Sequence, residues 1–122
     1  MKWLDATVSN ECDALERARL RFVEKPTEKR LHEMRTTGRR FRSLLEDVAD
    51  LAPLDRLLRR VKRAAAATDA ARDAAILLRL LESSVDPGEV GRAKPLLREL
   101  RKRERVATSR ARKHLQRVRF SP

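Results

Sequence analysis

Apolar residues recur at three- and four-residue spacing along four long stretches of the chain, and short polar segments separate these stretches. This spacing is typical of amphipathic helices. The separating segments contain Pro26, Pro53 and the turn sequence Asp86-Pro87-Gly88, and a proline disfavours helix at the residue before it. Helices are expected over about residues 3–23, 27–49, 55–83 and 89–118.

The connections between these helices are short, which favours antiparallel neighbours. Thr27 is expected to cap the second helix, Asp55 offers a start for the third, and the fourth begins at Glu89 or Arg92. The sequence therefore predicts an all-α fold, an antiparallel four-helix bundle that forms a single domain over residues 1–122.

Each of the last three helices has an apolar line that is expected to face the core. In the second helix it comprises Met34, Phe41, Leu45 and Val48. In the third it passes through Leu58, Val61, Ala65 and Ile76. In the fourth it comprises Leu96, Leu97, Leu100, Ala107, Ala111, Leu115 and Val118. Arg72 falls on the line of the third helix, so it needs an anionic partner, for which Asp69 and Asp73 are available.

A row of cationic side chains runs beside the apolar face of the second helix. His32, Arg35, Arg39 and Arg42 fall within an arc of roughly 80° on a helical projection. Because these groups would repel one another, the row indicates an anion lying along it. The arrangement suits a polyanion.

The fourth helix repeats this design. The residues that fall within roughly 60° of one another on it are Lys94, Arg98, Arg101, Arg105 and Arg112. Residues 92–119 contain twelve Lys or Arg and only two acidic residues. Their net charge of 12 − 2 = +10 is nearly the whole net charge of the chain, which is +12. A basic excess of this size implies an anionic partner, and Arg is suited to phosphate because its fork matches two oxygens at once.

Several other function classes lack the residues they need. Cys12 is the single cysteine, so no intramolecular disulfide or cysteine-based zinc site is expected, and His114 is too isolated to join His32 in a metal site. There is no Ser-His-Asp set, glycine-rich phosphate loop or acidic cluster for Mg²⁺, so we expect no enzyme, no cofactor and no metal. No apolar stretch could span a bilayer, and a cytoplasmic protein is expected.

The pattern His32-x-x-Arg35-x-x-x-Arg39-Arg40-x-Arg42, followed by Arg72-Asp73 on the next helix, resembles the CHAD family, the conserved histidine α-helical domain. The resemblance extends to the basic helix over residues 94–115. It implies a module that binds inorganic polyphosphate and localises to polyphosphate granules. The residues expected to bind polyphosphate are His32, Arg35, Arg39, Arg40, Arg42, Lys62, Arg72, Lys94, Arg98, Arg101, Arg105 and Arg112.

In this interpretation, the rows on the second and fourth helices are opposite walls of one groove. The family usually has two four-helix repeats, whereas this chain has one, so a homodimer is expected to rebuild the groove. Gly38 stands where the family usually has Ser or Thr, and close helix approach is a physical reason for a glycine there.

Nucleic acid is the main alternative ligand, because its phosphates also attract Arg and Lys. It is less favoured because the few aromatic residues lie outside the basic rows, where base stacking would need them. A helical adaptor for an acidic protein is a third alternative. Arg17 and Arg19 of the first helix are expected to be exposed and to serve as a reference for nonspecific charge.

Overall fold

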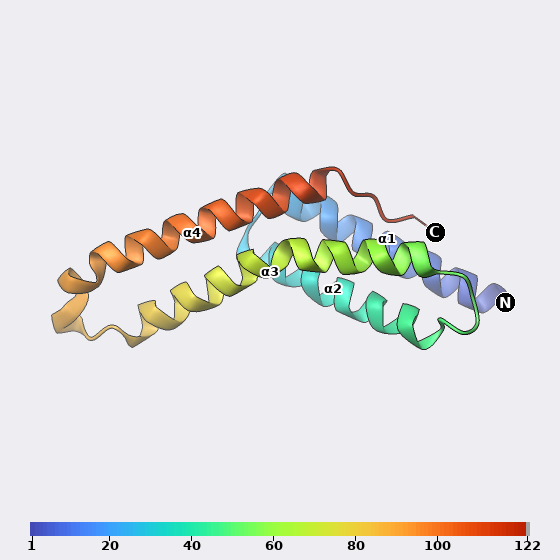
Figure 1. The fold of residues 1–122 in the computed structure, drawn as a ribbon, viewed down its shortest axis with the longest axis horizontal. Helices are drawn as coiled ribbons and strands as arrows, with labels where there is room; N and C mark the ends of the chain where they lie inside the picture. The colour runs from blue at the N-terminus through green and yellow to red at the C-terminus, as the bar shows by residue number, and fades with distance from the viewer. Residues whose placement is uncertain (122) are drawn as a thin grey trace.

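The computed structural model describes residues 1–121, and these residues form four long helices without any β-strand (Figure 1). The helices are α1 (Lys2–Glu24), α2 (Glu28–Asp47), α3 (Asp55–Ser84) and α4 (Val90–Gln116). A short 3₁₀ turn, η1 (Pro87–Glu89), follows the break at Asp86 and leads into α4. The predicted all-α four-helix fold is confirmed, and the predicted bounds agree with the observed ones to within a few residues.

The start of α2 follows directly from local sequence. The Thr27 hydroxyl accepts a hydrogen bond from the Arg30 backbone N–H at 3.3 Å, so it satisfies one of the free donors at the helix start. Thr27 is therefore the N-cap that the sequence predicts, directly after the proline that ends the preceding connection.

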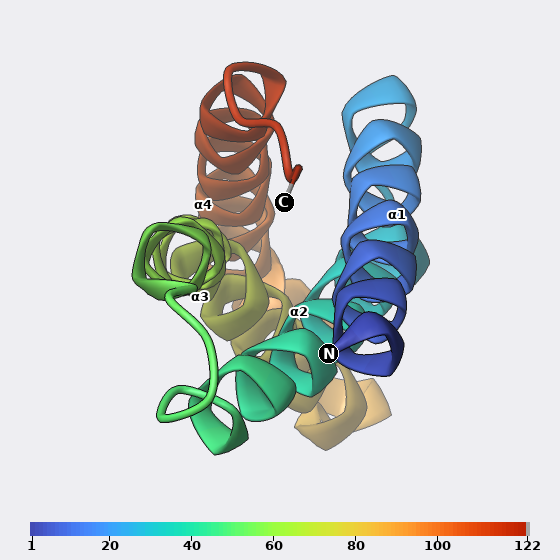
Figure 2. The ribbon, with the colours of Figure 1, turned by 90° about the vertical axis from the view of Figure 1, so that its right-hand side faces the viewer.

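The four helices are arranged in chain order around the bundle (Figure 2). Each helix packs against the next, and α4 also packs against α1, whereas α2 and α4 occupy diagonal positions and do not pack together. The α3–α4 pair is the longest, and it extends past the ends of α1 and α2 as a two-helix tip, defined here as residues 80–98 (Figure 1).

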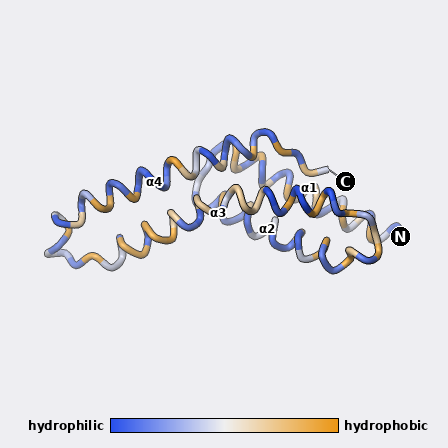
Figure 3. Tube along the Cα trace, viewed as in Figure 1, coloured by the Kyte–Doolittle hydropathy of each residue, from blue (hydrophilic) through white to orange (hydrophobic). Residues whose placement is uncertain are grey.

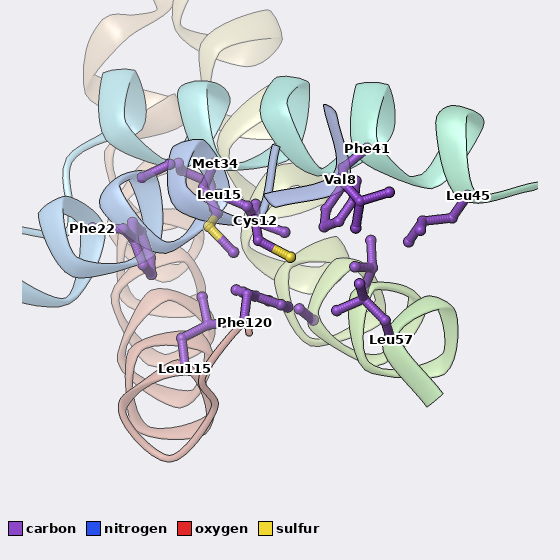
Figure 4. Close-up of a cluster of buried hydrophobic side chains, with 14 of the residues drawn as sticks. Val8, Cys12, Leu15, Phe22, Met34, Phe41, Leu45, Leu57, Leu115 and Phe120 are labelled. Carbon is purple, nitrogen blue, oxygen red and sulfur yellow. The ribbon is translucent and has the colours of Figure 1, made fainter. Parts of the chain in front are cut away.

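The main core lies where all four helices overlap. Its largest fully buried side chains include Leu15 and Phe22 of α1, Phe41 and Leu45 of α2, and Leu115 of α4 (Figure 4). A second, smaller cluster of Leu78, Leu97 and Leu100 joins α3 to α4 near the tip. Only two helices contribute to this cluster, and Leu77 and Leu80 of α3 stay exposed near it. The part of α3 toward the tip is largely hydrophobic (Figure 3).

The predicted apolar faces are confirmed in α2 and corrected in α3 and α4. All four residues of the predicted α2 face are buried. Ile76, predicted to face the core, is 58% exposed, and Leu96 of α4 is exposed as well. The buried line of α3 instead passes through Leu57, Val61, Ala64, Thr68, Ala71, Ala75 and Leu78. Alanine residues occur on several sides of α3, so the hydropathy of its sequence does not identify one side as the buried one.

Arg19, expected to be exposed, is buried and ties the end of the chain to α1. Its guanidinium donates to both carboxylate oxygens of Glu16, at 2.7 and 2.6 Å, and to the Leu115 carbonyl oxygen at 2.7 Å. Glu16 also accepts from the Phe120 backbone N–H at 3.2 Å, and the Phe120 ring is buried in the core. We call these four residues the C-terminal clasp. The Leu115 carbonyl lies in the last turn of α4, where helix carbonyls lack internal partners.

Candidate functional site

Two adjoining grooves run between α2 and α3, and both are lined by residues of the predicted cationic row. The Lys62 groove has a volume of about 210 Å³ and includes Arg35, Arg39, Arg42 and Lys62 in its lining. The His32 groove has a volume of about 490 Å³ and is lined by His32, Arg35, Arg39, Arg72 and Arg79, among others. Arg35 and Arg39 line both grooves, so the two form one continuous cationic surface.

The row faces α3 because of its spacing on α2. Positions separated by three or four residues recur on the same side of a helix. The apolar residues Met34 and Phe41 lie on the neighbouring side and are buried, which fixes the rotation of α2 about its axis. Packing of that apolar side therefore presents Arg35, Arg39 and Arg42 to the groove.

Arg35 is held rigidly between the two grooves. Its Nη1 lies 2.6 Å from the Thr68 hydroxyl, 3.3 Å from the Ala65 carbonyl oxygen and 2.9 Å from the Asp69 carboxylate. Its side chain is only 12% exposed, and Thr68 is buried beneath it. Arg35 therefore provides a fixed positive charge whose position is set by α3.

Arg39 and Lys62 are the cations most available to a ligand. Both are exposed, and neither forms a hydrogen bond or ion pair with any side chain or carbonyl among residues 1–121. Arg39 comes from α2 and Lys62 from α3, so an anion in the Lys62 groove can contact both helices. The groove floor is mostly small and apolar, with Ala64, Ala65 and Ala66 from α3.

Other cations of the grooves have carboxylate neighbours. Arg42 Nε lies 2.9 Å from Glu46, and this hydrogen bond is the main cause that lowers the pKa of Glu46. Arg72 pairs with Asp73 at 2.9 Å, so one of the two predicted acidic partners is confirmed, while Asp69 pairs with Arg35 instead. These pairs are exposed and contribute little to stability.

Arg79 is a groove residue that the sequence pattern did not predict. It lines the His32 groove and pairs with Glu28 of α2 and Glu82 of α3. Arg79 lies seven residues after Arg72, on almost the same side of α3, and that spacing could have identified it. Glu82 also lies 3.4 Å from Arg101, so a chain of charges connects α2, α3 and α4. Burial raises the pKa of the adjacent Glu104, and the nearby carboxylate of Glu28 raises it further.

The predicted opposite wall from α4 is wrong. Because α2 and α4 are diagonal, none of the row Lys94, Arg98, Arg101, Arg105 and Arg112 lines either groove. Arg101 lies near Glu82, and Arg112 Nε donates to the Val23 carbonyl oxygen at 2.7 Å, where α1 turns into α2. Arg112 therefore has a structural contact rather than a free charge.

Arg40 also lies outside both grooves. Its Nε is 2.9 Å from Glu11 of α1. The physical reason is its position: it follows Arg39 directly, and adjacent residues point about 100° apart on a helix. Arg40 therefore belongs to the α1–α2 contact.

Gly38 lies at the base of the Lys62 groove and is buried against α1. A methyl group added there would lie 3.8 Å from the Leu15 Cδ1 atom, which is ordinary van der Waals contact. Close helix approach therefore does not require glycine at this position, contrary to the explanation that the sequence offered.

Among residues 1–121, no group of three His, Cys, Asp or Glu side chains is placed to hold a metal ion. In the same part of the chain, every helix is too short or too polar to cross a membrane. Burial, with a smaller contribution from Asp13, raises the pKa of the Cys12 thiol to about 11, so this thiol stays protonated at neutral pH.

Comparison with known proteins gives one match. A family model described as the CHAD domain matches residues 6–122, nearly the whole chain. Among curated proteins and among solved structures, none matches at a significant level.

Proposed function

This chain belongs to the CHAD domain family, and we propose that it binds long-chain inorganic polyphosphate along the two grooves between α2 and α3. CHAD domains are associated with polyphosphate binding in general. The observation that carries the proposal is the pair Arg39 and Lys62, two exposed cations without partners among residues 1–121, beside the rigidly held Arg35.

The mechanism is binding by successive charges along a flexible polymer. Arg35 and Arg39 are shared by the grooves, so one polymer can pass from Lys62 and Arg42 to His32 and Arg72 without leaving the cationic surface. Guanidinium groups donate paired hydrogen bonds to phosphate oxygens, and the Lys62 ammonium adds a point charge. His32 adds a hydrogen-bond donor to the lining of the His32 groove. We propose binding, without catalytic turnover, as the role of these residues.

Nucleic acid is the competing ligand, and the grooves disfavour it. No Phe, Tyr or Trp side chain of residues 1–121 lines either groove, so unpaired bases have no aromatic ring on which to stack. Polyphosphate carries the same charged groups as nucleic acid but has no bases, so it needs no aromatic ring in the groove. Binding to polyphosphate would place the protein on polyphosphate granules in the cytoplasm.

Competition distinguishes the two ligands. With the protein bound to labelled long-chain polyphosphate at physiological salt, we expect unlabelled polyphosphate to displace the label far better than DNA or RNA at equal phosphate concentration. Affinity should fall with added salt and rise with polymer length, because longer chains engage both grooves. Equal displacement by nucleic acid, or equal affinity for short and long polyphosphate, would contradict the proposal.

We also propose that two copies associate through the outer side of α3 near the tip. Ile76, Leu77 and Leu80 are 58%, 42% and 59% exposed there, and Ile76 also lines the His32 groove. The apolar surface is therefore continuous with the cationic one, and a two-fold contact through it would bring two His32 grooves together. We therefore propose a second copy of this chain as the partner that covers the apolar surface, because it also extends the cationic surface.

Light scattering at micromolar concentration tests this association. We expect the unmodified protein to have the mass of a dimer and the Leu80→Glu variant to have the mass of a monomer, because a charge would be buried in the contact. Leu20→Glu is the matched control, since Leu20 is 52% exposed on α1, and it should leave the mass unchanged. A monomeric unmodified protein would rule the dimer out.

A further inference from the structure

Most of the positive charge of α4 has no role in the grooves between α2 and α3. Residues 92–119 carry twelve basic and two acidic side chains, yet none of them lines the Lys62 groove or the His32 groove. The charge of α4 therefore faces other parts of the surface. Three of its cations, none of them in the row that was expected to form the opposite wall, line a groove between α3 and α4.

A third groove, of about 480 Å³, lies between α3 and α4, and we call it the α3–α4 groove. Its floor is small and apolar and includes Ala67 and Ala70 of α3. Three cations from α4 line it, namely Lys102, Arg103 and Arg110.

The charge in this groove is mostly unneutralised. Lys102 and Arg110 are exposed and form no hydrogen bond or ion pair within residues 1–121. Arg103 Nε lies 3.5 Å from Glu99, but both side chains are more than half exposed, so water weakens this pair. Glu99 is the one acidic residue of the lining, against three cations.

The α3–α4 groove opens on the other side of α3 from the His32 groove. At about 100° per residue, Arg72 of the His32 groove points roughly 140° away from Ala67 and roughly 160° away from Ala70. The His32 groove and the α3–α4 groove therefore open in nearly opposite directions, as the position of α3 between α2 and α4 allows (Figure 2). Lys62 of the Lys62 groove points between them, roughly 140° from Ala67 and roughly 80° from Ala70. A polymer in the His32 groove leaves the α3–α4 groove accessible.

We infer that the α3–α4 groove is a second site for a phosphate polyanion, and that one molecule therefore connects two separate polyanion strands. The inference rests on the proposed function for the class of ligand, and it adds a site and a consequence to that function. Lys102, Arg103 and Arg110 contact phosphates of one strand, while Arg39 and Arg72 of the His32 groove contact phosphates of another. A protein with two such faces cross-links polyphosphate instead of only coating it.

Energy transfer between two polyphosphate preparations, one labelled with a donor and one with an acceptor, measures this cross-linking. We expect the unmodified protein to bring the two labels together. The Lys102→Ala, Arg110→Ala variant should need about tenfold more protein, or more, for the same transfer, because two phosphate contacts are lost. It should still bind a single labelled strand through the α2–α3 grooves.

The matched control is the Lys2→Ala, Arg17→Ala variant, which removes the same two kinds of charge from exposed positions of α1 outside the three grooves. It should cross-link like the unmodified protein, and Lys102→Arg should do so too because the charge is retained. All variants alter exposed side chains, and their helicity is checked by circular dichroism.

The outcomes separate this inference from the proposed function. If the Lys102→Ala, Arg110→Ala variant cross-links as well as its control, the second site is wrong while polyphosphate binding stands. In this comparison both variants also carry Leu80→Glu, so that a dimer formed through α3 cannot join the two strands in place of the second site. If the unmodified protein binds polyphosphate without joining the two labels, the second site is wrong as well. If it binds no polyphosphate, the proposed function itself fails.

Discussion

The Arg39→Ala, Lys62→Ala variant is expected to lose about 30- to 150-fold in affinity for long-chain polyphosphate, which corresponds to roughly 2–3 kcal/mol for two charge-assisted phosphate contacts. Both side chains face the Lys62 groove and have no partner among residues 1–121, so their removal leaves no buried group unsatisfied. The folded structure should therefore be unchanged. The slope of log affinity against log salt concentration should become shallower by about 1 to 2, because two fewer counterions are released.

Titrations of labelled polyphosphate at several salt concentrations measure both quantities. The Lys2→Ala, Arg17→Ala variant again provides the control, because it removes one lysine and one arginine from α1 and lowers the net charge equally. Equal losses in the two variants would mean that affinity follows total charge and that the α2–α3 grooves are not the site. Arg35 is a poorer target, since its contacts with Thr68 and Asp69 also support the packing of α2 on α3.

The largest expected effect on stability comes from the C-terminal clasp. Replacing Arg19 with alanine should lower the free energy of unfolding by about 3–5 kcal/mol, the usual effect of breaking a buried ion pair. Three hydrogen bonds to Glu16 and Leu115 are lost, and the Glu16 carboxylate that holds the Phe120 backbone N–H loses its neutralising partner. Thermal unfolding should shift down by more than about 10 °C.

Arg17→Ala is the reference for this variant, because Arg17 lies two residues away but is exposed, and its expected effect is within about 0.5 kcal/mol. The pH dependence gives an independent check. The hydrogen bond from Arg19 is the main cause that lowers the pKa of Glu16. A lowered folded-state pKa means that the carboxylate stabilises the fold above its ordinary pKa of 4.5 and loses this effect as the pH falls below it. The Glu16→Gln variant should therefore lose less stability than the unmodified protein on acidification. If Arg19→Ala is as stable as Arg17→Ala, the C-terminal clasp is dispensable for stability.

The bounds of the helices could be predicted from the sequence, but the side of each helix that faces the core was predicted correctly for α2 and wrongly for α3. In α2 the large apolar residues, such as Phe41 and Leu45, occupy one side, so burial could be assigned correctly. In α3 the run from Ala64 to Ala67 offers small apolar side chains in all directions. Its buried side is decided by packing against α2 and α4, which no pattern within α3 records, and Ile76 was consequently placed in the core.

One wall of the candidate site, on α2, could be predicted from the sequence, and the other wall could not. The row on α2 could be identified because its spacing keeps it on one side of a single helix. The partner wall could not, because it depends on which helices are neighbours, and a sequence of four helices allows either α3 or α4 opposite α2. The structure places α3 there, so Arg79 lines the site while Arg98 and Arg105 do not.

The alanine floor of the Lys62 groove has a thermodynamic consequence. Ala64, Ala65 and Ala66 have no side-chain rotamers, so the shape of this wall is set by the backbone of α3 and a ligand has no rotamers to order there. Ordering on binding is confined to long side chains such as Arg39 and Lys62 and to the polymer, while the release of counterions increases the entropy of the solution. Binding should therefore be driven mainly by entropy.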